Sequence, residues 1–141
     1  MKHRLLLIAF LMTAVLAVHA QQRPFNPAKF EAELEQFVAT EAALTPQESS
    51  RFFPIYREMR KKQIAIMSAG WKNKHIDISN DKACAEAIRQ RDNNDVELKE
   101  LQRTYHNKFL QVLPARKVIR IIRAEDKFHR QAFKRATRRD R

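Results

Sequence analysis

The sequence predicts an all-α fold of four helices, extended and bent rather than closed into a compact bundle. Its 141 residues include a single glycine, and no segment sustains the alternation of apolar and polar residues that marks a half-buried strand. Apolar residues recur instead every three or four positions in four separate segments, which is typical of amphipathic helices. One segment is very long and another contains an internal proline, so an elongated body is favoured.

The first two helices begin at recognisable capping sequences. Asn26 followed by Pro27 predicts the first start, because asparagine caps helices and proline suits the first helical position. Thr45 to Glu48 reads Thr-Pro-Gln-Glu, a capping box that predicts the second start. The expected core-facing residues are Phe30, Leu34, Phe37 and Val38 in the first helix, and Phe52, Ile55, Tyr56, Met59, Gln63, Ile66 and Met67 in the second.

Pro54 stands where the interior of the second helix is expected. It cannot donate a hydrogen bond to the Ser50 carbonyl, and its ring crowds that turn, so a bend or break is predicted. Pro54 lies on the side opposite Phe52, which would make the apolar side concave. The alternative is a pair of short helices that meet at Phe53.

The third helix is expected to begin at Ser79 or Asn80, after a break at 69–78, and to end near Val112. About 34 residues would measure near 50 Å, whereas a compact globule of this size has a radius of gyration of about 14 Å. The helix therefore either projects beyond a simple bundle or is interrupted at Asn93-Asn94. Pro114 begins the fourth helix, a basic segment at about 114–138. Such a thin body leaves apolar surface uncovered, which predicts a homodimer.

Residues 1–20 have the three parts of a secretory signal peptide. Lys2 and Arg4 precede an apolar run from Leu5 to Val18, and cleavage is predicted after Ala20. The alternative, a membrane anchor, would need more length, since 14 helical residues cover roughly 21 Å of a core about 30 Å thick. We therefore expect a periplasmic protein whose single all-helical domain is 21–141.

The exported chain would be strongly basic. Loss of Lys2 and Arg4 lowers its net charge from +12 to +10. Export excludes nucleic acid as the partner and favours anionic envelope surfaces or acidic stretches of other proteins.

Cys84 is the only cysteine, so no internal disulfide can form. The alanines around Cys84 favour a buried thiol, and a disulfide between chains is the alternative.

The sharpest pattern is a stripe of cations on the fourth helix. Its spacings of three and four place its members within about 80° on the helical wheel, and no acidic residue interrupts it. An ordinary solvent-exposed face usually carries both basic and acidic residues. The stripe is therefore either a surface that binds an anionic partner or, as the alternative, a solvated face without a partner. Phe53 and Met59 on the second helix are the candidate apolar contacts. The members of the stripe are Arg116, Arg120, Arg123, Lys127, Arg130, Lys134 and Arg138.

The sequence lacks the residue patterns that catalysis or metal binding requires. His75, His106 and His129 are too far apart in sequence for a zinc motif, and His75 with Asp77 is the one weak metal candidate. No nucleophile stands beside a base, and no phosphate loop is present. Glu125 lies within the apolar stripe of the fourth helix and would need a partner, for which a basic residue from another helix is favoured over a catalytic role. An enzyme, a cofactor and a metal are therefore not expected.

Leu44-Thr45-Pro46-Gln47-Glu48 resembles the repeated motif of the periplasmic LTxxQ family, to which Spy, CpxP and ZraP belong. Val112 to Arg116 occupies the place of the second copy, and Glu48 and Arg116 stand where that motif has its final glutamine. The resemblance implies a cradle-shaped antiparallel dimer with a basic, partly apolar concave surface. In that family this surface holds unfolding proteins without ATP or docks on the sensor domain of an envelope-stress kinase. The histidine-rich tracts of ZraP are absent here.

The expected function is therefore an ATP-independent periplasmic chaperone or stress adaptor. It would bind unfolded or acidic proteins transiently on its basic surface. One alternative is a regulatory ligand or sensor subunit of an envelope-stress or metal-responsive signalling system. A second is a protein whose basic helix binds the anionic envelope surface.

Overall fold

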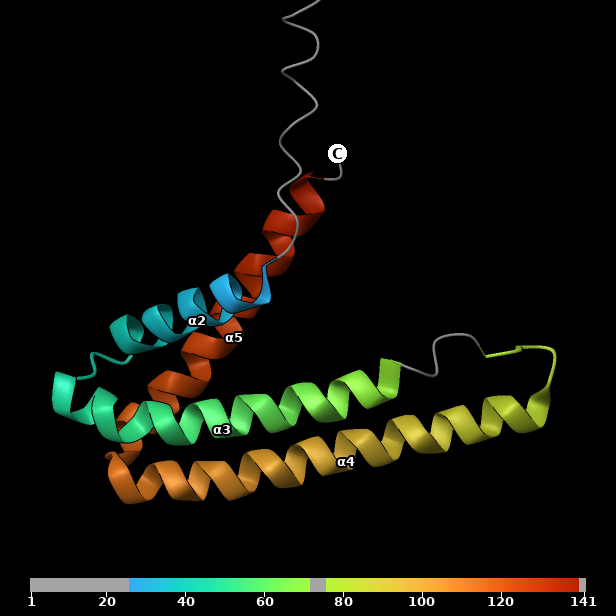
Figure 1. The fold of residues 1–141 in the computed structure, drawn as a ribbon, viewed down its shortest axis with the longest axis horizontal. Helices are drawn as coiled ribbons and strands as arrows, with labels where there is room; N and C mark the ends of the chain where they lie inside the picture. Colours follow the sequence, from blue (N-terminus) through green and yellow to red (C-terminus); the bar gives the residue numbers. More distant parts are fainter. Residues whose placement is uncertain (1–25, 72–75, 140–141) are drawn as a thin grey trace, which may run out of the picture. The chain divides into compact units, whose positions relative to one another are not determined.

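The computed structural model describes residues 26–71 and 76–139, and over these residues the protein is all-α with no strand (Figure 1). The helices are α2 (Pro27–Glu41), α3 (Pro46–Trp71), α4 (Asp81–Val112) and α5 (Ala115–Arg139). The prediction of an all-α fold with four helices is thus confirmed. The chain divides into a unit of residues 1–32 and a unit of residues 33–141, and the packing described below is that of the second. The expected signal peptide and His75 lie outside the described residues.

Three of the four helices begin at the predicted capping residues. The Asn26 side chain accepts a hydrogen bond from the Lys29 amide at 3.1 Å, and the Asn80 side chain accepts one from the Ala83 amide at 3.0 Å. Thr45 and Glu48 form a reciprocal box: the Thr45 amide donates to the Glu48 carboxylate at 2.8 Å, and the Glu48 amide donates to the Thr45 hydroxyl at 3.2 Å. Each cap satisfies backbone donors that the first helical turn leaves unpaired.

Helices α3 and α4 are both continuous. Pro54 lies inside α3 on its exposed side, so the alternative of two short helices meeting at Phe53 is wrong. The helix also extends to Trp71, three residues into the expected break. Likewise, α4 runs unbroken for 32 residues through Asn93 and Asn94, so the interruption does not occur. At 1.5 Å per residue α4 is about 48 Å long.

The core is built at one end of the long helices. Phe52 on α3 lies 4.8 Å from Phe109 on α4, measured between ring centroids, and 5.2 Å from Tyr56. Phe37 on α2 packs against Phe128 on α5 at 5.5 Å. The buried apolar residues are Leu34, Val38, Ala42, Phe52, Tyr56, Met59, Tyr105, Phe109, Leu113, Val118, Ile121, Ala124 and Phe128.

The other end of the α3–α4 pair has no such core. Between Ile64 and Thr104, no residue whose burial the structure describes is fully buried. Several large apolar side chains in this stretch are exposed, namely Ile64, Met67, Ile76, Ile78, Ile88 and Val96. Helices α3 and α4 pack along one another, but the distal part of the pair is two helices thick and holds little apolar surface away from water.

Helix α2 ends in a left-handed turn at Ala43. The Leu44 amide donates to the Ala39 carbonyl at 3.0 Å and the Ala43 amide donates to the Thr40 carbonyl at 3.1 Å, which is the Schellman pattern. Ala43 has φ of 49°, a region that glycine occupies without the steric cost of a β-carbon. The turn therefore places an unfavourable residue where glycine is usual.

Replacing Ala43 with glycine is expected to stabilise the protein by about 0.5–1 kcal/mol, because it removes the steric cost of the left-handed alanine. Urea unfolding followed by circular dichroism measures the change. Ala65→Gly, at an exposed interior position of α3, is the matched control and should destabilise by about 1 kcal/mol. A loss of stability in Ala43→Gly equal to that in the control would contradict the expectation.

Candidate functional site

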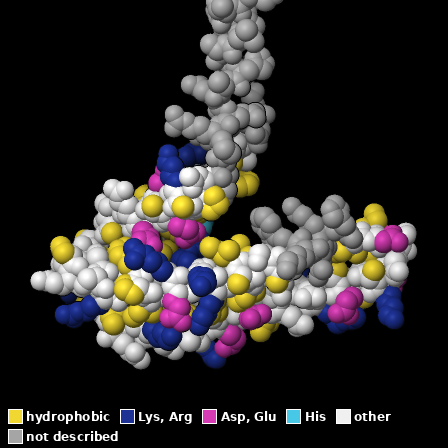
Figure 2. All heavy atoms as spheres, viewed as in Figure 1, with side chains coloured by type: hydrophobic (Ala, Val, Ile, Leu, Met, Phe, Trp, Pro, Cys, Tyr) yellow, Lys and Arg dark blue, Asp and Glu magenta, His cyan; other side chains and the backbone are white. Residues whose placement is uncertain are grey.

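Helix α5 presents the predicted stripe of cations to solvent. All seven members, from Arg116 to Arg138, are exposed, and each lies three or four residues from the next, so they share one face of the helix. By contrast, basic and acidic side chains alternate over the lower part of Figure 2, where α3 and α4 lie. The single-signed face of α5 is the strongest candidate for a binding surface.

Lys127 is the one member of the stripe that a described residue engages. Its ammonium donates to both carboxylate oxygens of Glu41, at 2.9 and 3.0 Å, and lies 5.5 Å from the centre of the Phe37 ring. Within residues 26–71 and 76–139, no side chain forms a hydrogen bond or ion pair with the charged groups of the other six members. The stripe therefore keeps most of its charge available to a partner.

A shallow open depression of about 340 Å³ lies in the middle of this face. The end of α2 supplies Glu41, and all the other lining residues come from α5. Buried Ala124 is the one small residue among long side chains. The lining residues are Glu41, Arg120, Arg123, Ala124, Lys127 and Arg130. The sequence indicated the arginines and the lysine but not Glu41, because nothing in its local pattern shows which helix α2 ends against.

Apolar side chains lie along one edge of the stripe. Ile119, three residues after Arg116, is 46% exposed, and Phe133, three residues after Arg130, is 71% exposed. Asp126 lies on the same edge between them and is also exposed. The cationic face of α5 is therefore flanked by apolar groups that the described residues leave open to solvent.

The two apolar residues proposed on α3 differ from that expectation. Met59 is 1% exposed, so its expected availability to a partner is wrong. It follows Phe52 by seven residues and faces the core with it. Phe53 is half-buried, with the Arg57 guanidinium 5.8 Å from its ring centroid and edge contacts to Phe52 and Tyr56 at 5.2 and 6.0 Å. Only part of that ring can contact a partner.

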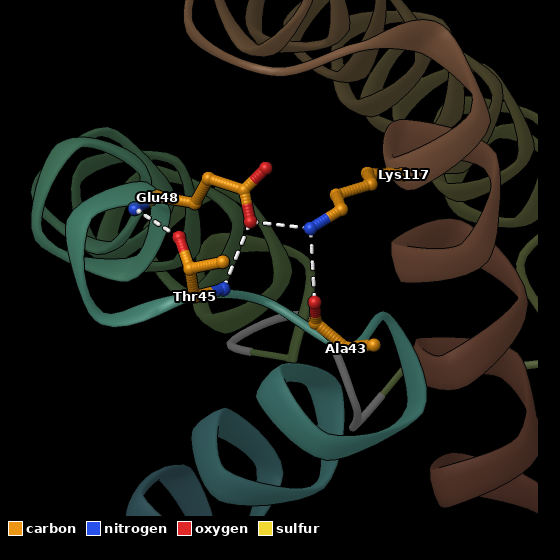
Figure 3. A network of polar contacts seen from close by, with 4 residues as sticks. All are labelled: Ala43, Thr45, Glu48 and Lys117. Atoms are coloured by element: carbon orange, nitrogen blue, oxygen red, sulfur yellow. Dashed lines mark hydrogen bonds and ion pairs between the residues drawn. The ribbon is translucent and has the colours of Figure 1, made fainter.

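The Leu44–Glu48 motif forms a junction between α3 and α5 (Figure 3). The Lys117 ammonium donates to the Glu48 carboxylate and, at 2.9 Å, to the Ala43 carbonyl at the end of α2. Thr45 and Glu48 complete the capping box, Leu44 is half-buried, and Pro46 and Gln47 are exposed. The predicted capping function is confirmed. Lys117 is the partner that the sequence did not reveal, since it lies 69 residues from Glu48.

This junction should make stability depend on pH. The hydrogen bond from Lys117, followed by the one from the Thr45 amide, lowers the pKa of Glu48 from its ordinary value of 4.5. Since the folded pKa is depressed, the contribution is complete above pH 4.5 and declines as pH falls through the lowered folded pKa. We expect Glu48→Gln to be less stable than the unmodified protein at pH 7, and the difference in free energy of unfolding to become smaller below pH 4.5. Urea unfolding of both proteins at each pH measures that difference. A difference that stayed constant from pH 7 to pH 3 would contradict this assignment.

The remaining candidate residues have structural partners. Glu125 is half-buried and accepts a hydrogen bond from the Tyr56 hydroxyl of α3 at 2.9 Å. Another helix thus supplies a tyrosine hydroxyl to this carboxylate, where a basic side chain was expected. The Asp77 carboxylate accepts from the Ser79 amide and hydroxyl at 3.0 and 2.6 Å, and these bonds lower its pKa. Asp77 therefore stabilises the turn before α4.

Cys84 is half-buried rather than fully buried, which corrects the favoured expectation. Its thiol lies 3.8 Å from the carbonyl oxygens of Asp77 and Ile78. His106 is half-buried beside Phe109, and burial, with a smaller effect of Lys99, lowers its pKa. Among the described residues, no group of three histidine, cysteine, aspartate or glutamate side chains could hold a metal ion.

The described helices include none with the length and apolar content needed to cross a membrane. In comparisons with known proteins, no family model, curated protein or solved structure matches this chain.

Proposed function

We propose that this chain is an ATP-independent binding protein that transiently holds flexible, acidic protein segments on the cationic face of α5. The observation that carries the proposal is the stripe itself. Six of its seven cations have no side-chain partner in the described part of the chain, and Ile119 and Phe133 stand exposed along its edge. A surface of this kind supports a chaperone or a stress adaptor.

The charge would act before the apolar contacts. At physiological ionic strength the Debye length is about 8 Å, so a row of cations attracts an acidic segment over roughly that distance and speeds its association. Exposed charge pairs contribute little individually, about 0–1 kcal/mol, which keeps the complex short-lived. Ile119 and Phe133 would then bury part of the client's apolar surface.

The proposal extends to location and assembly. The protein would act in the periplasm after removal of residues 1–20, as an antiparallel homodimer with a cradle-like basic surface. The exposed apolar side chains of the distal α3–α4 pair, such as Met67 and Ile88, support this assembly, because a second copy could cover them.

An aggregation assay with two clients tests the function. The purified protein is added to an acidic client that aggregates on reduction, and to a basic client of similar size, at low and high salt. We expect suppression of the acidic client at about 20 mM salt and a severalfold weaker effect at about 500 mM, because salt screens exposed charges. Equal protection of both clients, or protection that salt does not change, would refute the electrostatic mechanism.

A further inference from the structure

We propose that the depression between the end of α2 and α5 is a binding site for a phosphate monoester group, and that Glu41 occupies this site in the absence of ligand. The inference goes beyond the holding of protein clients, because the ligand is a small dianion and its binding is measured without any client.

A carboxylate is already among the groups that line the depression. Both carboxylate oxygens of Glu41 accept hydrogen bonds from the Lys127 ammonium, at 2.9 and 3.0 Å. Glu41 is the last residue of α2, so the carboxylate that contacts the α5 cations comes from a different helix. The contact shows that one of the lining cations, Lys127, already pairs with an oxyanion.

The depression has room for a larger group than this carboxylate. Ala124, 2% exposed, contributes only a methyl group, while Arg120, Arg123 and Lys127 extend around it on the same face. The depression is open to solvent, and its volume of about 340 Å³ is far more than a single water molecule needs. A phosphate group and the first atoms of its ester substituent fit within that volume.

The charges favour a dianion over a second carboxylate. Four cations line the depression against one carboxylate, and no described side chain engages Arg120, Arg123 or Arg130. A phosphate monoester carries about −1.5 to −2 charges at pH 7 and three acceptor oxygens. Arginine binds such groups through two parallel hydrogen bonds. A carboxylate has one charge and two oxygens and would leave most of these donors unused.

Glu41 can be displaced at little cost. The Lys127 and Glu41 side chains are 47% and 36% exposed, and solvent-exposed ion pairs contribute little to stability. Lys127 would exchange one oxyanion for another and keep its hydrogen bonds, while the Glu41 carboxylate would return to water. Glu41 therefore acts as an internal competitor that weakens the binding of the external anion.

Calorimetric titration of the purified protein with glycerol 3-phosphate at pH 7.5 and low chloride tests the site. We expect saturable binding. Glu41→Gln should tighten it about two- to tenfold by removing the competitor, and Arg123→Gln should weaken it about tenfold or more by removing a charge-assisted contact. Arg116→Gln and Arg138→Gln, which make the same charge change on α5 outside the depression, should leave binding within about twofold.

Four results would overturn the proposal. These are the absence of saturable binding in Glu41→Gln, weaker or equal binding by that variant, unchanged binding by Arg123→Gln, and equal weakening in the two control variants. Thermal unfolding of each variant confirms that the fold is retained, as expected for exposed positions. Loss of phosphate binding while client protection persists would reject this site alone.

Vesicles distinguish a lipid headgroup from a soluble phosphate. Phosphatidylcholine vesicles that contain phosphatidic acid present a monoester, and those that contain phosphatidylglycerol present a diester. Stronger sedimentation with phosphatidic acid, enhanced in Glu41→Gln, would identify a headgroup as the source. Binding of glycerol 3-phosphate without vesicle binding would identify a soluble ligand. Equal sedimentation with both vesicles, whether or not Glu41 is replaced, would contradict monoester recognition.

Discussion

Phe52→Ala is expected to destabilise the protein by about 3–5 kcal/mol, the range for removal of a buried phenylalanine ring. Phe52 is 0% exposed, and its ring lies 5.2 Å from Phe53, 5.2 Å from Tyr56 and 4.8 Å from Phe109. The substitution would lose the transfer free energy of the ring and leave a cavity where α3 packs on α4. Since small domains are stable by only about 5–15 kcal/mol, this is a large share of the total.

Urea unfolding followed by far-ultraviolet circular dichroism measures this loss. Phe133→Ala is the matched control, because Phe133 is 71% exposed and its removal should change stability by less than about 0.5 kcal/mol. If Phe52→Ala does not fold, Phe52→Leu keeps much of the volume and should lose about 1–2 kcal/mol. Equal effects of Phe52→Ala and Phe133→Ala would show that the aromatic cluster is not the core.

Replacing Arg120, Arg123 and Arg130 together with glutamate is expected to weaken protection of an acidic client at least tenfold. The change removes three cations that no described side chain engages and introduces three anions, which alters the charge of the α5 face by six units. Steering by a field of this kind changes association rates by about 10- to 1,000-fold. At least a tenfold higher protein concentration should be needed for half-maximal suppression at low salt.

The control must carry the same change in net charge. Lys61, Lys82 and Arg91 are exposed cations on α3 and α4, so their joint replacement with glutamate alters the whole molecule equally but leaves the α5 face intact. Protection should then decline far less than in the α5 variant. Similar losses in the two triple variants would mean that overall charge, and not the α5 stripe, attracts the client.

The helices were predictable because their signals are local. Asn26, Thr45 with Glu48, and Asn80 cap helices through residues three positions away, and such spacings can be read from the sequence. Pro54 was a harder case. Its missing hydrogen bond weakens one turn, yet packing of Phe52 and Tyr56 on either side keeps α3 continuous.

The contacts between helices were not predictable. Lys117 meets Glu48 across 69 residues and Lys127 meets Glu41 across 86, and no local pattern specifies such pairs. Met59 shows a different error. Its position seven residues after Phe52 already placed it on the core side of α3, whereas its flexible apolar side chain suggested a role in binding. Met59 is buried, as its spacing from Phe52 indicates. The stripe on α5 was visible because it lies within one helix.

Because burial is uneven along α4, the two ends of this helix are stabilised in different ways. Its carboxyl-terminal third is anchored by Tyr105 and Phe109, whereas the turns between Asp81 and Thr104 rest on helical propensity, the Asn80 cap and partial contact with α3. The amino-terminal turns can consequently fray and re-form without disturbing the anchored third, because sparsely packed segments open at low free energy. Helix α4 thus combines a stably packed carboxyl-terminal third with amino-terminal turns that open easily.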